Sequence, residues 1–382
     1  MSNAVTPHVS SHVARTLENA NPGESFFRKD AKDAKVVVRR FRRRARMAIL
    51  EIGEIRGFKA ASSVMRIIPF FAGFPAAPGA ICPHLMKMTP ILLGVLFAAA
   101  ISASAQGVVA PGATLQKLAG DFKFTEGPTR DKNGNVFFVD QDNNRIMEWS
   151  ADGKLSTFMQ PSGYANGMCF DANGNLIACA DEHNQLWSIA PDKTMTVLVT
   201  NYQGKYLNGP NDVWVAPNGA MFITDPFYKR TWWDHTTMAL TNQEVFYLSP
   251  DRKNLVMVTD DLKQPNGITG TPDGKNLIVS DIRAGQTWRY DIQPDGSLSN
   301  KTFICALGSD GMTIDEEGNL YLCGRGVIVV DKAGKQIDHI DVPESWTANV
   351  CFSGKDRKTL FITASKSFYS IQLIYKGANP AK

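Results

Sequence analysis

Residues 208–225 read NGPNDVWVAPNGAMFITD, a polar segment followed by two short apolar runs that a Pro-Asn-Gly turn joins. The turn and the second run, NGAMFIT at 218–224, recur along the chain. The other copies are NGNVFFV (133–139), NGNLIAC (173–179), DGKNLIV (273–279), EGNLYLC (317–323) and DRKTLFI (356–362). Neighbouring copies are 39 to 55 residues apart, which indicates a repeat protein.

Each copy is followed by a third apolar run, and most are followed by a fourth, with no amphipathic helix between them. Short strands with turn signals at this density predict an all-β fold. Four strands per repeat at this spacing are typical of a blade, so the sequence predicts a six-bladed β-propeller over residues 106–382. The last blade ends after its third run, SFYSIQLIY at 367–375. We expect residues 113–119, ATLQKLA, to supply its fourth strand and close the ring.

Charge divides the chain into two parts. Residues 1–105 hold 15 Lys and Arg against 6 Asp and Glu, whereas residues 106–382 hold 26 against 31. The larger part is mildly acidic and has no basic stripe, which argues against nucleic-acid binding.

Residues 86–105 begin with MKM, continue with an apolar run and end in Ala-Ser-Ala, which is the pattern of a secretory signal peptide. The run is short for a membrane span, and a buried helix is the alternative interpretation. We therefore expect a periplasmic or secreted protein without a stable membrane anchor once mature. Residues 1–85 precede the signal and are interpreted as a wrongly assigned or disordered basic extension.

A polar residue stands eight positions before each turn residue of the repeat. In a propeller, equivalent positions lie on a ring around the axis, so these side chains are predicted to meet at one end of the central channel. Local turn formation is the alternative explanation, but it does not account for a glutamate. The six residues are Glu126, Asn166, Asn211, Asn266, Asp310 and Asn349.

Carboxylate and amide oxygens in this number suit a hard cation, Ca²⁺ above all. No Cys or His pair has the spacing of a zinc site, although Zn²⁺, Mg²⁺ and Mn²⁺ remain alternatives to calcium. The sequence thus predicts one divalent metal ion at the ring.

Four segments carry a family resemblance. EGPTRDKNG (126–134), GKYLNGPNDV (204–213), PNGITGTPDGKNLIVSD (265–281) and DGMTIDEEGNLY (310–321) resemble the gluconolactonase/regucalcin (senescence marker protein) family, in particular its bacterial gluconolactonase-like branch. The resemblance implies a six-bladed propeller that binds one divalent metal through a Glu, two Asn and an Asp. In this chain those ligands are Glu126, Asn211, Asn266 and Asp310.

Other residues are expected to line a substrate pocket around the metal. Tyr206 and Gly209 replace basic residues of family members, which points to a neutral or apolar substrate. The insertion TWWDHTTMALTNQ at 231–243 accounts for the longest repeat spacing and is expected to cover the channel mouth. The predicted pocket residues are Asn166, Asn349, Asn208, His183, Trp232 and Trp233.

The resemblance implies a metal-dependent hydrolase that opens a lactone, which is a small-molecule substrate. We expect the protein to be a monomer. Asp310 is the predicted catalytic base, while Asp140, Asp225 and Asp281 are interpreted as loop caps. Two alternatives stay open: a phosphotriesterase-like hydrolase that uses the same metal site, and a non-catalytic propeller that binds a ligand or protein.

Overall fold

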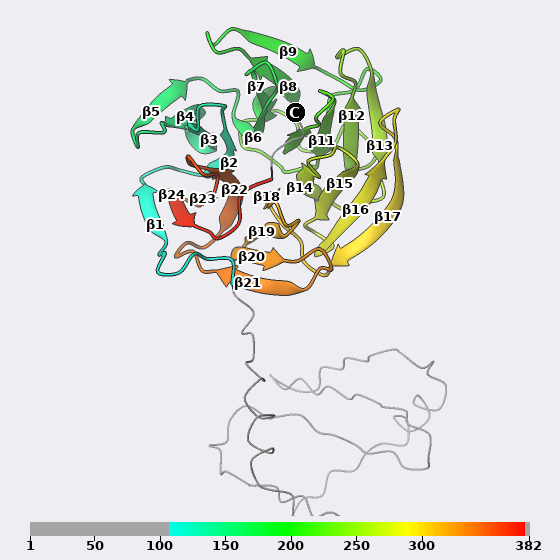
Figure 1. Ribbon diagram of the computed structural model, residues 1–382. Coiled ribbons are helices and arrows are strands. Elements are labelled where there is room, and N and C mark those ends of the chain that lie inside the picture. Colours follow the sequence, from blue (N-terminus) through cyan, green and yellow to red (C-terminus); the bar gives the residue numbers. More distant parts are fainter. Residues whose placement is uncertain (1–106, 379–382) are drawn as a thin grey trace, which may run out of the picture. The chain divides into compact units, whose positions relative to one another are not determined.

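Six four-stranded antiparallel sheets make up residues 107–378, the part of the chain that the computed structural model describes. They surround a common axis as the blades of a propeller (Figure 1). Two short 3₁₀ turns, η1 (Gln141–Asn143) and η2 (Asp181–His183), are the only helical elements of these residues. No helix in 107–378 is long and apolar enough to cross a membrane. The predicted all-β, six-bladed architecture is confirmed.

Strands of the first three blades follow one another without interruption. Blade one comprises β2 (Thr125–Arg130), β3 (Val136–Asp140), β4 (Arg145–Trp149) and β5 (Leu155–Met159). Blade two comprises β6 (Ala165–Phe170), β7 (Leu176–Ala180), β8 (Gln185–Ile189) and β9 (Met195–Val199). Blade three comprises β10 (Val213–Val215), β11 (Met221–Asp225), β12 (Glu244–Leu248) and β13 (Leu255–Thr259).

Blades four and five repeat this order, and blade six combines both ends of the described chain. Blade four comprises β14 (Pro265–Gly270), β15 (Asn276–Asp281), β16 (Gln286–Ile292) and β17 (Leu298–Cys305). Blade five comprises β18 (Met312–Ile314), β19 (Leu320–Gly324), β20 (Gly326–Val330) and β21 (Gln336–Ile340). Blade six comprises β22 (Thr347–Ser353), β23 (Thr359–Ala364), β24 (Ser367–Gln372) and β1 (Gln116–Ala119).

The ring closes through β1, which pairs antiparallel with β24. Gln116 lies opposite Ser370 and Lys117 opposite Tyr369. The predicted closing strand is therefore confirmed, although it begins at Gln116 and not at Ala113. The first strands of successive blades contact one another in the cyclic order β2, β6, β10, β14, β18, β22, so they line the axis.

The repeated turn has one backbone conformation in all six blades. The turn glycines of the first five blades have φ between +71° and +90°, a region that glycine enters without a steric penalty. Arg357 takes the same place in blade six at φ +59°. Its N–H donates to the carbonyl of Gly354, three residues earlier. The N–H of Gly134 makes the equivalent bond to the carbonyl of Asp131. The degenerate copy is thus a true sixth repeat.

Six apolar clusters hold the blades together, and each draws residues from two neighbouring blades. Between blades one and six, for example, the rings of Phe138 and Phe368 stack with centroids 4.2 Å apart. Burial of such rings between sheets is the main source of stability in this fold. It also fixes the innermost strands relative to one another around the axis.

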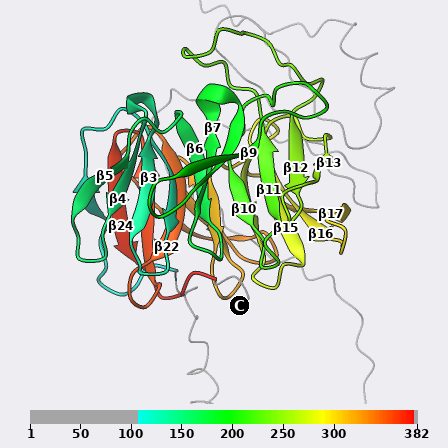
Figure 2. The same cartoon turned by 90° about the horizontal axis from the view of Figure 1, so that it is seen from above.

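The longest connection within a blade joins β11 to β12 and contains the predicted insertion. Figure 2 shows it rising above the propeller, on the side where β11 ends. Since β10 begins on that side, the insertion stands over the end of the channel that holds the predicted ring.

Candidate active site

All six ring residues are buried at one end of the channel, with 2 to 9% of their surface exposed. Four of them lie within β2, β6, β14 and β22, and Asn211 and Asp310 stand two residues before β10 and β18. The structure therefore places the predicted ring residues at equivalent positions on all six blades.

Irregular strand pairing presents these side chains to the axis. The pairing register shifts between Glu126 and Thr129 in β2, and between Pro265 and Ile268 in β14. Similar shifts occur at the start of β6 and β22. A bulge of this kind bends a strand and redirects a side chain, which a regular ladder would point into the blade.

Glycine follows the ring residue in four of the blades and allows adjacent blades to approach closely. A Cβ atom on Gly167 would lie 2.6 Å from the carbonyl oxygen of Asn211 on the next blade. Instead, Gly167 donates its N–H to that oxygen over 2.7 Å. The X-Gly pairs thus narrow the channel just below the ring.

Asp310 is held by hydrogen bonds to both of its carboxylate oxygens. Asn266 donates Nδ2 to Oδ1 over 2.8 Å, and the Trp346 indole donates to Oδ2 over 2.5 Å. Asn266 also donates to the Tyr228 hydroxyl at 2.8 Å. Both donor hydrogens of Asn266 are used in this way, which leaves its carbonyl oxygen as an acceptor for a ligand.

Burial raises the pKa of Asp310 to about 6, although Trp346, Asn266 and the Arg230 charge oppose the shift. Burial also raises the pKa of Glu126 well above its usual range, and repulsion from Asp310 adds to the effect. A third carboxylate, Asp212, lies within electrostatic range of Asp310, and burial raises its pKa to about 7. The ring therefore gathers negative charge that a cation would stabilise.

The donor set fits a hard divalent cation. Glu126 and Asp310 supply carboxylate oxygens, Asn266 has a free carbonyl oxygen, and the Asn211 side chain makes no hydrogen bond within residues 107–378. No three Cys, His, Asp or Glu side chains of that range form a metal cluster, so an oxygen site here needs the amides.

The other two ring amides contact different neighbours. Asn166 donates to Gln141 over 3.4 Å, and Gln141 donates in turn to Asp181 over 3.4 Å. Asn349 accepts the N–H of Val350. Asn166 thus belongs to a polar network that extends outward into blade two.

Asn208 and His183 lie away from this network. Asn208 donates to the carbonyls of Asp225 and Asn242 and so joins the insertion to β11. His183 is half exposed, 3.7 Å from Glu182, with its ring tilted against Trp187. The structure brings neither side chain to the ring.

Both tryptophans of the insertion contact protein groups. Trp232 stacks on Tyr164 with centroids 4.2 Å apart, and the Arg230 guanidinium carbon lies over its ring, 5.3 Å from the ring centre. Trp233 stacks on His235 and donates its indole N–H to the Asp181 carbonyl over 2.6 Å. Both tryptophans are therefore already engaged by groups of the protein.

The residues that sequence reasoning missed come from blades two and three. Asp181, Tyr228 and Arg230 lie beside the ring, but none stands at a repeated position of the turn-strand pattern. Asp212 carries a detectable signal, because it occupies the place of a glycine that follows the ring residue in four other blades.

The three aspartates that close the second strands act as loop caps, in agreement with their interpretation from sequence. Each accepts the backbone N–H groups two and three residues before a ring residue. Asp225, for example, accepts those of Asn208 and Gly209, both over 2.8 Å. The same bonds recur at Asp140 and Asp281.

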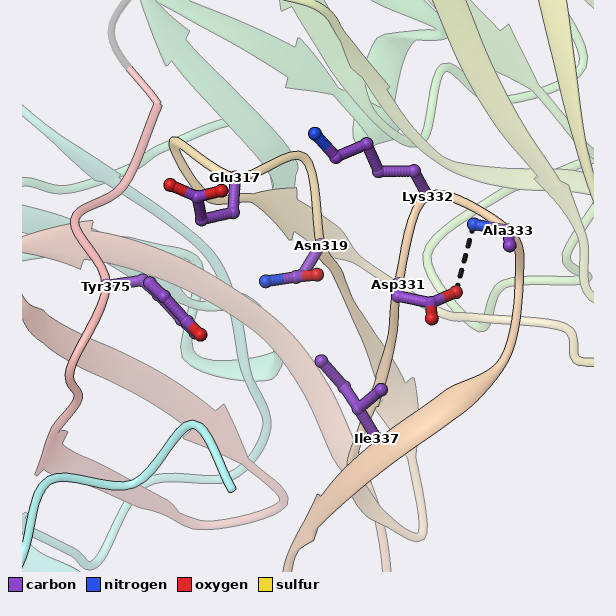
Figure 3. Close-up of a pocket in the computed structure, with 7 residues that line it drawn as sticks. All are labelled: Glu317, Asn319, Asp331, Lys332, Ala333, Ile337 and Tyr375. Carbon is purple, nitrogen blue, oxygen red and sulfur yellow. Dashed lines mark hydrogen bonds between the residues drawn. The ribbon is translucent and has the colours of Figure 1, made fainter. Parts of the chain in front are cut away.

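Two hollows lie at the opposite end of the strands. One of about 320 Å³ leads along the axis toward Asp212 and Asn349, with Arg130 and Arg357 in its lining. The other, also about 320 Å³, is shallow and lies on blade five beside Tyr375 (Figure 3). Asp331 and Asn319 in its lining take part in local turns, such as the bond from the Ala333 N–H to Asp331.

Comparison with known proteins relates this geometry to one family. The sequence profile described as the SMP-30/Gluconolactonase/LRE-like region matches residues 124–366. A gluconolactonase of Zymomonas mobilis is 30% identical and is matched over 68% of this chain and 81% of its own. Diisopropyl-fluorophosphatase of Loligo vulgaris is 25% identical and is matched over 65% of this chain and 87% of its own.

Solved structures agree with this relationship. A gluconolactonase from Xanthomonas campestris superposes with a TM-score of 0.66 and 27% identity, over 71% of this chain and 92% of its own. A calcium-binding regucalcin from Agrobacterium tumefaciens shares the fold at a TM-score of 0.60 and 18% identity, over 72% and 96%.

Proposed function

Since this chain belongs to the SMP-30/gluconolactonase/LRE-like family, we propose that it opens a lactone by hydrolysis at the polar ring, with the help of one divalent cation. The observation that carries the proposal is the convergence of Glu126, Asn211, Asn266 and Asp310 at one end of the channel. These are two carboxylates and two amides, all buried, and no basic side chain forms an ion pair with either carboxylate within residues 107–378.

Ca²⁺ is the cation that this oxygen-only set favours, with Zn²⁺, Mg²⁺ or Mn²⁺ as alternatives. Glu126, Asn211, Asn266 and Asp310 would hold it. When bound, a divalent ion supplies Lewis-acid polarisation of a carbonyl oxygen. Its positive charge would also offset the repulsion between the carboxylates of Glu126 and Asp310.

Asp310 is the residue that we assign to proton transfer. It accepts a proton from water while the water oxygen forms a bond to the lactone carbonyl carbon. The ring C–O bond then breaks, and the proton passes from Asp310 to the departing alkoxide oxygen, which leaves a hydroxy acid. Burial raises the pKa of the Asp310 carboxyl, which makes this carboxylate a stronger base than an ordinary aspartate.

Asn266 and Trp346 position this carboxylate. Each donates to a different oxygen of Asp310, which fixes the plane of the carboxylate relative to the axis. Preorganisation of this kind reduces the reorganisation that proton transfer requires.

The similarity to diisopropyl-fluorophosphatase favours one second candidate, hydrolysis of a phosphotriester at the same ring. Hydrolysis rates for δ-gluconolactone, δ-valerolactone and diisopropyl fluorophosphate, with and without EDTA, distinguish the candidates. We expect lactone opening that EDTA abolishes and Ca²⁺ restores. Phosphotriester hydrolysis without lactone opening would select the second candidate, and no turnover of either class would leave a non-catalytic propeller.

We further propose that the propeller is exported to the periplasm or secreted and acts as a monomer on a small-molecule lactone. The signal-like residues 86–105 support export.

A further inference from the structure

The insertion between β11 and β12 brings an arginine to the mouth of the ring. Arg230 Nε lies 2.7 Å from Oδ2 of Asp181, and the two side chains are 20% and 2% exposed. The Nε–H does not point along this line, so the contact is an ion pair and not a hydrogen bond. A buried carboxylate therefore restrains the guanidinium from one side.

Aromatic rings restrain it from two further directions. The guanidinium carbon lies 5.3 Å from the ring centre of Tyr228 and 5.3 Å from that of Trp232. Trp232 is itself held by its stack on Tyr164. An arginine fixed in this way loses little conformational entropy when it binds a further group.

Arg230 is close to the groups assigned to catalysis. Tyr228, whose ring it covers, accepts a hydrogen bond from Asn266, and Asn266 donates to Asp310. Its terminal N–H groups make no hydrogen bond within residues 107–378, so they remain available as donors.

We propose that Arg230 is a specificity-determining residue, whose terminal N–H groups donate to an oxygen of the substrate outside the reacting ester. The inference rests on the proposed lactonase function and concerns which lactone is selected. Asp181 already compensates the arginine charge, and Glu126 and Asp310 balance the divalent cation of the proposed site, so no net positive charge is left beside Arg230. The acceptor is therefore a neutral hydroxyl oxygen and not a carboxylate or phosphate.

The test compares two lactones that differ in hydroxyl groups. Wild type, Arg230→Met and Arg230→Lys are assayed on δ-gluconolactone and on δ-valerolactone, which has no hydroxyl. Loss of a charged donor predicts a KM for δ-gluconolactone that is roughly 10- to 100-fold higher in Arg230→Met, with kcat within about twofold. KM for δ-valerolactone should change less than about twofold. Arg230→Lys keeps the charge but not the planar arrangement of N–H donors. Its KM for δ-gluconolactone should therefore lie between those of wild type and Arg230→Met.

Arg289→Met is the matched control, because Arg289 is an exposed arginine on β16. This variant should have wild-type kcat and KM values for both lactones. If Arg230→Met raised the KM values for both lactones by the same factor, or raised neither, the inference would be overturned.

Binding of 1,5-anhydroglucitol, a cyclic polyol that cannot be hydrolysed, separates this inference from the catalytic proposal. Saturation-transfer NMR should detect it with wild type and with Arg289→Met, and not with Arg230→Met. If wild type opened no lactone but bound the polyol through Arg230, the catalytic proposal alone would fail. If lactones were opened and polyol binding did not depend on Arg230, the arginine inference alone would fail.

Discussion

Asn266 donates its side-chain amide to Asp310 over 2.8 Å, across the boundary between blades four and five. This bond orients both residues. It engages the amide nitrogen of Asn266, so that the carbonyl oxygen remains as the free atom of this side chain, and it occupies one lone pair of Asp310. One contact between neighbouring repeats therefore determines which atoms two of the four proposed ligands present to a metal.

Asp310→Asn should abolish lactone opening, with a loss of roughly 10²- to 10⁴-fold in kcat, because the amide cannot accept a proton from water. It should also weaken Ca²⁺ binding, since one of two negative ligands is lost. Steady-state kinetics and titration calorimetry measure the two effects. Asp341→Asn, at a carboxylate whose side chain is 96% exposed, is the control.

Glu126→Gln should weaken Ca²⁺ binding as strongly as Asp310→Asn does. At saturating Ca²⁺, however, its kcat should exceed that of Asp310→Asn, because Glu126 serves only as a ligand in the proposed mechanism. Unchanged metal affinity in both variants would refute the ligand assignment. Equal kcat values at saturating metal would refute the separate role of Asp310.

Gly209→Ala should destabilise the protein by about 1–3 kcal/mol. Its φ is +147°, and a Cβ atom there would lie 2.7 Å from the Trp233 ring. Gly204→Ala separates strain from crowding, because Gly204 also has a positive φ, +79°, but nothing within 4 Å of the Cβ position. Urea unfolding of both variants gives the comparison. Equal losses would mean that contact with Trp233 contributes nothing.

Asp225 predicts a pH dependence of stability. Burial raises its pKa to about 7, although the N–H groups of Asn208 and Gly209 oppose the shift. Between about pH 4 and 7 the folded state keeps a proton that the unfolded state releases, so this stabilising contribution is lost as pH rises, by up to about 1.4 kcal/mol per unit. Asp225→Asn removes this dependence and leaves one N–H without its acceptor.

The difference in the free energy of unfolding between wild type and Asp225→Asn should therefore be larger at pH 5 than at pH 7.5. Urea unfolding at the two pH values measures it. A gap that stays constant, or grows with pH, would show that Asp225 is ionised in the folded protein at pH 5.

Export predicts that the mature chain begins at Gln106, directly after Ala105. N-terminal sequencing of protein recovered from the native host tests this position. A chain that starts at Gln106 should also match the melting temperature and kcat of the full chain. A mature N-terminus well upstream of Gln106 would contradict the signal-peptide interpretation.

Repetition made the fold and the ring predictable. Six copies of one turn fix the register of six innermost strands, so counting back from Gly219 reaches Asn211 and counting back from Arg357 reaches Asn349. A shift of one residue would have reversed the direction of the side chain, and the repeats exclude it.

The insertion was not predictable in the same way, because it has no counterpart in the other blades. Replacement of a basic residue by Gly209 suggested a pocket without positive charge. Arg230, from the next loop, nevertheless places a guanidinium group beside the ring. Trp233 occupies the space that Gly209 leaves. Such a contact depends on how a loop folds back, which no periodicity encodes.

Pairing of β1 with β24 gives the protein a seam that joins segments about 250 residues apart in sequence. A chain still leaving the ribosome cannot form blade six until β24, the last strand of the propeller, has been made. Closure must therefore await synthesis of all the other blades, and the loop-closure entropy of joining distant segments slows it. A circular permutant that joins the present ends and opens a loop between other blades would move the seam, and with it the last step of folding.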